Sequence, residues 1–317
     1  MKQFLSCDWG TSSFRLKLVE ASNLQTQADV QNDSGIISTN ENWRKVDKGQ
    51  SRFLFYSSVI SSAISTLEEK VGHRLSGIPV ILSGMASSSL GMVQLPYKQL
   101  PFRTDGSDLN VERIAASTEF GHDVFIISGV CSATEVMRGE ETQLVGAVEG
   151  NSGADVIYVL PGTHSKHIMV KGGAACDFKT YMTGEIFSLL SKNSTLSEAV
   201  TDASGASSNT NIEAFVEGVR DSQNSNLLNS LFRTRTRFLL DKLKQESNRS
   251  YLSGLLIGSE VLDLLKGKPG KFVVVSSGIG DHYKVAIKTL GDDGSLSILS
   301  DRDVAIRGQF RIVSHVH

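Results

Sequence analysis

The first group of residues able to do phosphate chemistry lies near the N-terminus, from Asp8 to Arg15, in the order Asp-Trp-Gly-Thr-Ser-Ser-Phe-Arg. Asp8 follows an apolar run, and a carboxylate there can hold Mg²⁺ directly or through water. Gly10 lets the backbone come close to a phosphate, and the hydroxyls of Thr11 and Ser12 can donate hydrogen bonds to its oxygens. Arg15 can neutralise charge that develops there. The alternative is an ordinary hairpin with a buried tryptophan.

A second turn of similar composition spans residues 160–166, in the order Leu-Pro-Gly-Thr-His-Ser-Lys. Gly162, Thr163 and Ser165 repeat the small and hydroxyl-bearing residues of the first turn, and Lys166 adds a positive charge. We expect these four residues to bind phosphate groups by the same backbone and hydroxyl contacts. If both turns face one cleft, the phosphates of a nucleotide would lie between them.

A third candidate follows the apolar run at 272–276. Ser277, Gly278 and Gly280 lie between this expected strand and an expected helix. A strand that ends in glycines before a helix can form a shelf for a planar base and its ribose, and these three residues are therefore candidates for nucleoside binding. The pattern is common in α/β proteins and is not specific alone.

Two adjacent carboxylates, Glu140 and Glu141, follow Arg138 and Gly139. One carboxylate can accept a proton from a substrate hydroxyl, and Arg138 can bind an anionic group with two hydrogen bonds. Adjacent helical positions point about 100° apart, so only one glutamate should face a substrate. We expect Gly139 to start the helix near Glu140 and to leave Arg138 on the preceding turn. The alternative is a solvated, charged helix face.

Strands and helices alternate along the chain, which is typical of layered α/β proteins. Apolar spacing and turn residues predict strands at 3–8, 12–20, 25–31, 78–82, 124–128, 156–160, 167–170, 272–276 and 296–299. They predict helices at 51–71, 110–119, 134–148, 212–221, 226–245, 251–266, 281–290 and 302–312. A Ser/Asn-rich segment at 201–211 is expected to be a solvated connection.

The two hairpins indicate an internal repeat. A shift of 152 residues places Gly10-Thr11 on Gly162-Thr163 and Ser13 on Ser165. Each half then opens with an apolar strand, a Gly-Thr-x-Ser turn and an alternating strand. Similarity at half the chain length predicts two related domains, 1–130 and 131–317.

Composition excludes several classes of protein. The 317 residues carry a formal net charge of −2, which argues against a nucleic-acid binder. The apolar runs are far too short to span a membrane. Cys7, Cys131 and Cys176 form no CxxC pair, which indicates a reducing compartment and a cytoplasmic protein. The chain has no G-x-x-x-x-G-K-[ST] motif, so it is not a P-loop enzyme.

The Asp8 to Arg15 segment resembles the first phosphate motif of the superfamily of sugar kinases, actin and heat-shock chaperones. Four further segments resemble the 2-dehydro-3-deoxygalactonokinase family: Val136–Leu144, Leu160–Lys166, Tyr181–Glu185 and Tyr251–Gly258. They lie in the expected order over most of the chain. The resemblance implies an α/β fold of two related actin-like (ribonuclease H-like) domains that face a central nucleotide and sugar cleft.

The resemblance also implies phosphoryl transfer from ATP, with Mg²⁺, to the 6-hydroxyl of 2-dehydro-3-deoxy-galactonate or a close 2-keto-3-deoxy sugar acid. Asp8 would position the metal or the attacking group. The Gly-Glu-Glu-Thr-Gln segment is similar to the Gly-Asp-Gln-Gln segment of glycerol kinase, which nominates Glu140 as the general base and leaves Glu141 as the alternative. The implied partners are ATP and a small sugar acid, and a homodimer is left open.

One departure from the family pattern concerns the substrate carboxylate. Many members carry a Gly-Ser-Arg element after the position of Gly84-Met85, and this chain has no arginine there. Arg138, Arg103 or a backbone nest would have to replace it. Two other functions stay open: a nucleotide- or sugar-binding sensor or degenerate kinase of the same superfamily, and a ribokinase-like sugar kinase with Asp281 as its base.

Overall fold

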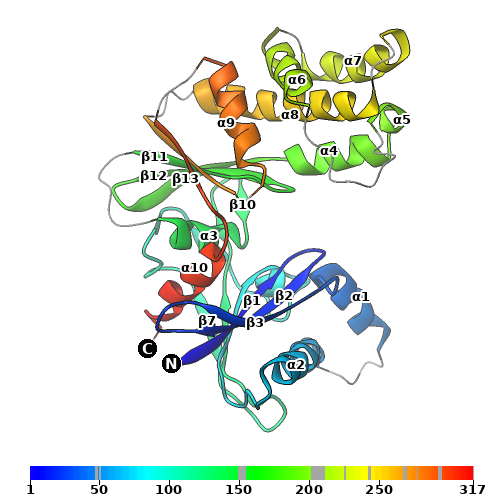
Figure 1. Cartoon of the computed structure of the whole chain (residues 1–317). Helices are drawn as coiled ribbons and strands as arrows, with labels where there is room; N and C mark the ends of the chain where they lie inside the picture. The colour runs from blue at the N-terminus through cyan, green and yellow to red at the C-terminus, as the bar shows by residue number, and fades with distance from the viewer. Residues whose placement is uncertain are drawn as a thin grey trace. The chain divides into compact units, whose positions relative to one another are not determined.

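The computed structural model describes residues 1–46, 49, 51–148, 155–200, 211–224, 226–241, 244–266, 270–276, 278–291 and 295–316. The chain forms two compact units (Figure 1). Unit 1 comprises Met1–Ser152, Gly172–Asp177 and Asp301–His317, and unit 2 comprises Gly153–Lys171 and Phe178–Ser300. These units do not follow the expected division into 1–130 and 131–317, because the helix after Gly139 and the C-terminal helix both pack within unit 1. A division of the chain into domains at residue 130 stays a prediction.

Unit 1 is built on a six-stranded sheet with the order β3-β2-β1-β4-β8-β7. Its strands are β1 (Gln3–Trp9), β2 (Phe14–Glu20), β3 (Thr26–Asn32), β4 (Val80–Gly84), β7 (Val111–Ile114) and β8 (Val124–Ile127). β1 and β2 form an antiparallel hairpin, and β1 also pairs parallel with β4. The parallel pairing brings the ends of β1 and β4 together, with Asp8 opposite Ser83.

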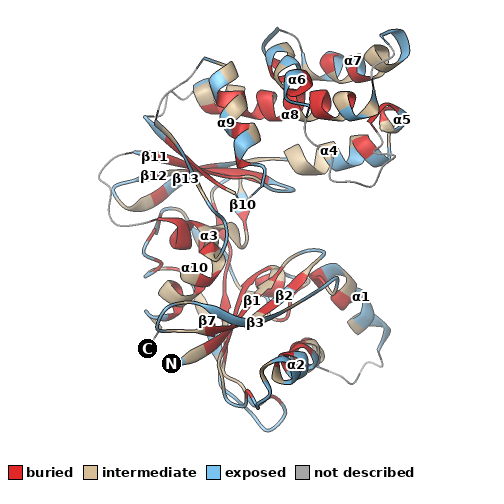
Figure 2. Ribbon diagram, viewed as in Figure 1, coloured by how far each residue is buried: buried red, intermediate tan, exposed pale blue. Residues whose placement is uncertain are grey.

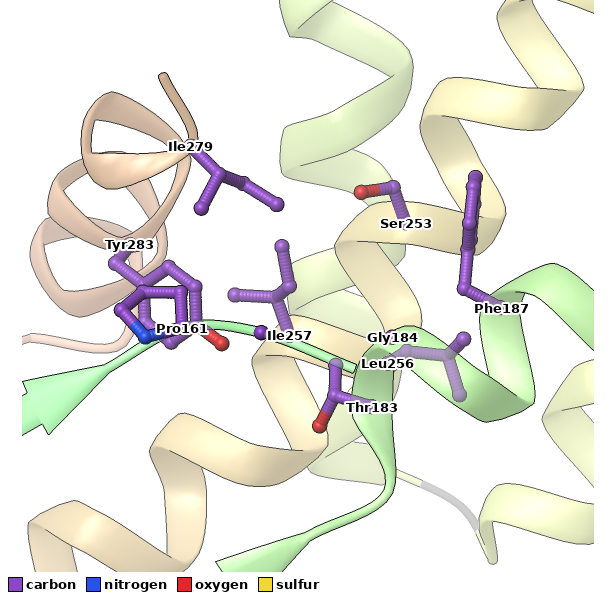
Figure 3. Close-up of a pocket in the computed structure, with 10 residues that line it drawn as sticks. Pro161, Thr183, Gly184, Phe187, Ser253, Leu256, Ile257, Ile279 and Tyr283 are labelled. Carbon is purple, nitrogen blue, oxygen red and sulfur yellow. The ribbon is translucent and has the colours of Figure 1, made fainter. Parts of the chain in front are cut away.

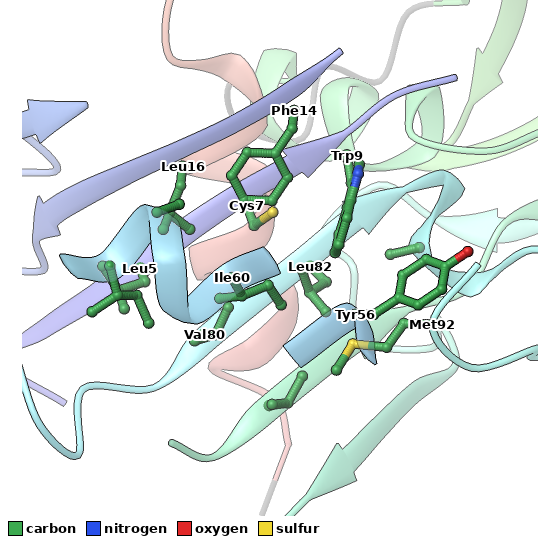
Figure 4. Packing of buried hydrophobic residues seen from close by; sticks show 14 of the residues in the cluster. Leu5, Cys7, Trp9, Phe14, Leu16, Tyr56, Ile60, Val80, Leu82 and Met92 are labelled. Carbon is green, nitrogen blue, oxygen red and sulfur yellow. The ribbon is translucent and has the colours of Figure 1, made fainter. Parts of the chain in front are cut away.

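Alternate residues of β1 face different helices. Leu5, Cys7 and Trp9 are fully buried against α2 (Arg52–Val71), which presents Tyr56 and Ile60 to them (Figure 4). This contact explains the apolar spacing that predicted a helix over 51–71.

The opposite face of the sheet carries α10 (Val304–Val313), which packs on α3 (Glu140–Ala147). The Phe4 ring stacks on Phe310 of α10, with 5.8 Å between the centroids. Side chains alternate along a strand, so Asp8 points to the same face as Phe4.

The sheet that contains the strands of unit 2 has the order β15-β14-β11-β12-β13-β6. Its strands are β6 (Phe102–Arg103), β11 (Val156–Leu160), β12 (Ser165–Lys171), β13 (Ala174–Tyr181), β14 (Lys271–Val275) and β15 (Ser295–Leu299). β11 and β12 form an antiparallel hairpin, and β14 pairs parallel with both β11 and β15. The order β13-β12-β11-β14-β15 therefore repeats the order β3-β2-β1-β4-β8 of unit 1.

The helices of unit 2 are α4 (Thr183–Lys192), α5 (Ser197–Val200), α6 (Ile212–Asn224), α7 (Leu227–Leu240), α8 (Gln245–Lys266) and α9 (Gly280–Thr289). Most of the residues of α8 between Tyr251 and Leu264 are buried (Figure 2). α6 and α8 approach closely at Gly218 and Gly254, where an added Cβ would lie about 2 Å from a backbone oxygen of the other helix. The remaining short elements are a 3₁₀ turn at Met85–Ser87, β5 (Lys98–Gln99), β9 (Val130–Cys131) and β10 (Val136–Met137).

Several expectations about elements need correction. The helix expected at 110–119 is wrong, because Val111–Ile114 pairs antiparallel with β8 as an edge strand. α1 (Ile36–Lys45), β13 and α4 were not expected. The helix expected over 134–148 begins at Glu140, as Gly139 predicted. Residues 201–210 of the Ser/Asn-rich segment, and Ser277, lie outside the described residues.

Candidate active site

The turn after β1 is closed by backbone contacts and leaves hydroxyl groups exposed. The Gly10 N–H donates to Ser13 O at 2.9 Å. Thr11 and Ser12 are exposed. The start of α1 packs directly on this turn, because a Cβ on Gly35 would lie 2.4 Å from the Ser12 backbone. The turn is therefore held by a helix that the sequence pattern did not predict.

Asp8 lies beside both a cation and a second carboxylate. Arg15 Nη1 donates to Asp8 Oδ2 at 3.1 Å, and the Asp8 side chain is 30% exposed. Burial raises the pKa of Asp8, Arg15 lowers it, and the nearby Glu140 charge raises it. The segment that carries Glu140 begins near Asp8, because Gly139 lies against Gly84 and Gly84 lies against Asp8. A single carboxylate with a second one nearby suits Mg²⁺, which proteins bind through one or two carboxylates together with substrate phosphates.

Two glycines bring the start of α3 to Asp8. Gly84 has φ +82°, and a Cβ there would lie 2.8 Å from Trp9 O and 3.4 Å from Asp8 Oδ1. Gly139 has φ +107°, and its Cβ would lie 3.3 Å from Gly84 Cα. Side chains at these positions would be strained and would force the backbones apart. The two glycines thus allow α3 to begin next to the end of β4.

The two adjacent glutamates have different environments. Glu141 is fully buried, and both of its carboxylate oxygens accept the Gly139 N–H, at 2.9 and 2.7 Å. Burial, together with the Glu140 charge, raises the pKa of Glu141 to about 7. Glu140 is partly exposed, and its Oε2 accepts the Arg138 N–H at 3.0 Å. Of the two carboxylates, Glu140 is the one that solvent and a ligand can reach.

α10 fixes the position of α3 from behind. A Cβ on Gly146 would lie 1.8 Å from Val304 O, and one on Gly308 would lie 1.9 Å from Thr142 O. The two helix backbones are therefore nearly in contact. Arg311 Nη1 also donates to the carbonyl oxygen of Val145, at 2.8 Å, and so satisfies a group at the C-terminal end of α3.

Arg138 lies against the segment that lacks the family arginine. Its Nη1 donates to Ser87 O and Oγ at 2.7 and 2.6 Å, and its guanidinium lies 4.3 Å from the centre of the Tyr97 ring. Arg103 is oriented differently, because its Nε and Nη2 donate to Asp105 Oδ2 at 3.1 and 2.8 Å. The guanidinium of Arg103 is thus engaged within its own loop.

In unit 2, the second turn has an exposed outer part and a buried inner part. Gly162 and Thr163 are exposed. Ser165 is 1% exposed, and its hydroxyl contacts the Tyr283 hydroxyl at 3.0 Å. Lys166 is also buried, and its Nζ donates to the His164 carbonyl oxygen at 3.1 Å. Of the four candidates in this turn, Gly162 and Thr163 face solvent, and Ser165 and Lys166 lie inside.

A small pocket of about 50 Å³ lies beside this turn (Figure 3). Its lining joins Gly162 of the turn, the first residues of α4, one face of α8 and the first turn of α9. The lining residues are Pro161, Gly162, Thr183, Gly184, Phe187, Ser253, Leu256, Ile257, Ile279 and Tyr283. Gly278 and Gly280 flank the lining residue Ile279 in the sequence. A Cβ on Gly184 would lie 2.4 Å from Gly162 O, so this glycine lets α4 meet the turn.

Comparisons with known proteins decide the family. The model of the 2-keto-3-deoxy-galactonokinase family matches residues 8–312. The chain belongs to the 2-keto-3-deoxy-galactonokinase family. Enzymes of this family are phosphotransferases with an alcohol group as acceptor.

Two relatives and one solved structure agree with this assignment. The 2-dehydro-3-deoxygalactonokinase of Escherichia coli strain K12 is 28% identical over 99% of this chain and 98% of the relative. A protein of the same name from Rhizobium meliloti strain 1021 is 28% identical over 96% of this chain and 94% of its own length. A Sinorhizobium meliloti crystal structure described under that name is 24% identical, with a TM-score of 0.81 over 99% of this chain and 96% of its own, and shares the fold.

The actin-like α/β fold expected of the 2-keto-3-deoxy-galactonokinase family is confirmed by the repeated strand order and by this shared fold. Within the described residues, no helix is both long enough and apolar enough to cross a bilayer. Sequence reasoning missed the pocket residues Thr183, Phe187, Ser253 and Ile279. Thr183 and Ser253 lie within two of the segments that resemble the family, 181–185 and 251–258, and this resemblance is the signal that could have found them.

Proposed function

We propose that the protein transfers the γ-phosphoryl group of ATP to the 6-hydroxyl of 2-dehydro-3-deoxy-galactonate or a close 2-keto-3-deoxy sugar acid. Membership of the family supports a sugar-acid kinase. The observation that carries the catalytic part is the start of α3, where Glu140 is accessible beside Asp8 while Glu141 is turned inward.

Glu140 is the general base in this proposal. Its carboxylate accepts the proton of the sugar hydroxyl as that oxygen attacks phosphorus. The Arg138 N–H holds one Glu140 oxygen, which orients the carboxylate without neutralising it. Arg138 also binds the carboxylate of the sugar acid in place of the missing family arginine, with Arg103 as the alternative. The Arg138 guanidinium stacks on the Tyr97 ring, and this contact keeps the guanidinium in one orientation.

The turn residues Gly10, Thr11, Ser12 and Arg15 act on the γ-phosphoryl group. The two hydroxyls donate hydrogen bonds to its oxygens, and Arg15 neutralises charge that develops during transfer. Mg²⁺, when bound through Asp8, neutralises part of the phosphate charge.

The nucleotide is bound by unit 2. Thr163 offers its backbone amide to the phosphates, and Gly162, without a side chain, lets them come close, while Ser165 and Lys166 support the turn from inside. The base and ribose lie at the mouth of the small pocket between Ile279 and Phe187, next to Gly278 and Gly280. Ser277, also a candidate for this role, lies outside the described residues.

The test is a coupled assay of sugar-dependent ADP release with a panel of aldonates, hexoses and 2-keto-3-deoxy acids. The Glu140→Gln variant should lose roughly 100-fold or more in kcat, because a general base typically contributes that much. Its KM for the sugar acid should change little. The matched variant Glu141→Gln should keep most activity.

Two other outcomes have defined meanings. If Glu141→Gln is the crippling change, the base assignment is wrong by one residue. If no 2-keto-3-deoxy acid stimulates ADP release from the wild-type protein, the sensor alternative is correct. The ribokinase-like alternative needs another fold and is wrong for a chain of this family; Asp281→Asn should therefore leave most turnover. The homodimer stays a prediction that sedimentation would test.

A further inference from the structure

A buried carboxylate in unit 2 connects the segments around the pocket. Glu260 lies on α8 and is 3% exposed. It accepts hydrogen bonds from His167 Nε2 at 2.8 Å and from the Tyr283 hydroxyl at 3.0 and 2.9 Å. It also accepts the hydroxyl proton of Thr183. His167, Thr183 and Tyr283 come from β12, α4 and α9, so one carboxylate links three elements to α8.

The hydrogen bonds continue from Glu260 to the phosphate turn. The Tyr283 hydroxyl donates to Glu260, so it is free to accept the proton of the Ser165 hydroxyl across 3.0 Å. Ser165 Oγ in turn accepts the Gly162 N–H at 3.4 Å. The chain of donors therefore runs from the turn amide through Ser165 and Tyr283 to the carboxylate. Such chains polarise one another, and each member fixes the orientation of the next.

This arrangement is costly for stability alone. Moving a carboxylate out of water carries a desolvation penalty that hydrogen bonds only offset, and an apolar residue of similar size would often be as stable. The His167 Nδ1 atom is also buried, with no hydrogen-bond partner among the described residues. The polar cluster coincides with the place where the turn, α4 and α9 must be held in register around the pocket.

We infer that Glu260 is a positioning residue for the nucleotide: its carboxylate sets the Gly162 turn and the starts of α4 and α9 in the geometry that binds ATP. The inference rests on the proposed function, which places the nucleotide in unit 2. Glu260 does not line the pocket, so it acts through Ser165, Thr183 and Tyr283.

The experiment compares Glu260→Gln with the matched control Asp263→Asn. Asp263 lies one turn further along α8 and also anchors this helix to β13, accepting from Tyr181 and Lys179, both at 2.7 Å. The hydrogen bonds of its carboxylate go to Tyr181 and Lys179, which lie outside the donor chain from Gly162 to Glu260. The glutamine amide presents one acceptor and one donor, so the donors around Glu260 cannot all be satisfied.

We expect Glu260→Gln to raise KM for ATP about tenfold, since a buried hydrogen bond to a charge is worth at least that factor. KM for the sugar acid should stay within about twofold. Asp263→Asn should leave both KM values unchanged. Tyr283→Phe removes only the hydroxyl that joins Ser165 to Glu260. Like Glu260→Gln, it should raise KM for ATP. The double variant should be no worse than the more severe single variant, because both changes break one chain.

Two outcomes would overturn the inference. If Glu260→Gln lowers Tm but leaves KM for ATP equal to that of Asp263→Asn, Glu260 is structural only. If Glu260→Gln does not fold, Tyr283→Phe provides the test instead. An unchanged KM for ATP in Tyr283→Phe would then overturn the inference. Failure of the proposed function looks different, because the wild-type protein itself would then show no sugar-dependent ADP release. The effect of Glu260→Gln on ATP binding would then be read from the Tm shift that ATP causes.

Discussion

At the scale of single residues, the two adjacent glutamates show where sequence reasoning stops. The sequence indicates that only one of Glu140 and Glu141 can face a substrate, since neighbouring helical positions diverge. Which one depends on the backbone of Gly139, whose φ of +107° turns its N–H toward the Glu141 carboxylate. This φ value reflects the contact of Gly139 with Gly84, far away in the sequence, and no local pattern encodes it.

Glu141 gives a pH prediction with a definite sign. Its pKa is about 7 in the folded protein against an ordinary value of 4.5, so the folded state binds the proton more tightly. Its contribution to stability is therefore fully present below about pH 4.5 and is lost as the pH rises through 7, a change of ~3 kcal/mol. We expect the free energy of unfolding, measured with urea, to fall more between pH 5 and pH 8 in the wild type than in Glu141→Gln. An equal change of the unfolding free energy with pH in the two proteins would contradict this prediction.

Arg138 gives a binding prediction. Replacing it with methionine keeps a long apolar side chain but removes the guanidinium that contacts Ser87 and Tyr97. We expect Arg138→Met to raise KM for the sugar acid by roughly 10- to 100-fold, the worth of a charge-assisted hydrogen bond. KM for ATP should stay close to that of the wild type. The comparison variant Arg103→Met should have a small effect, and the reverse pattern would assign the carboxylate to Arg103.

At the scale of elements, the hairpins and the strongly periodic α2 were predicted, and elements held by distant contacts were not. α1 has few apolar residues, and its start is fixed by the fit of Gly35 against the turn at Ser12. β7 was mistaken for a helix because its short segment gains its structure from pairing with β8. In both cases tertiary contact outweighs local preference.

The crossing of α3 and α10 gives a prediction at this scale. A methyl group on Gly308 would lie 1.9 Å from Thr142 O, so the helices must separate and α3 must move. We expect Gly308→Ala to lower the free energy of unfolding by about 3 kcal/mol and to reduce kcat as Glu140 shifts. Gly121→Ala is the control, because no atom lies within 4 Å of its added Cβ. A Gly308→Ala protein with normal stability and kcat would show that this packing is not needed.

At the scale of the whole molecule, the repeat was predictable from two Gly-Thr-x-Ser turns, because each marks an equivalent hairpin in equivalent strand orders. The residues that make up each unit could not be predicted from the sequence. Unit 1 is assembled from three stretches of chain, and which stretches join depends on packing between residues that lie hundreds of positions apart.

The proposed division of labour between the units can be measured by hydrogen exchange. ADP alone should slow exchange in unit 2, at residues 160–166 and 183–187, because it lacks the γ-phosphoryl group assigned to the Thr11 turn. The sugar acid alone should slow exchange in unit 1, near residues 84–92 and 137–141. Protection of unit 1 by ADP, or of unit 2 by the sugar acid, would reverse the assignment of the binding sites.

The place of α10 in unit 1 also bears on synthesis at the ribosome. Gln309 Nε2 donates to Cys7 O at 2.9 Å and to Ser83 Oγ at 2.8 Å, so β1 and β4 acquire these bonds only when α10 has been made. At elongation rates of about 5 to 20 residues per second, the first strand would wait roughly 15 to 60 s for this partner. Unit 2 is complete in the nascent chain earlier, at Ser300. Unit 1, although its translation begins first, is thus the last unit to be completed, and a premature stop codon before Val304 would release a chain with a complete unit 2 and an incomplete unit 1.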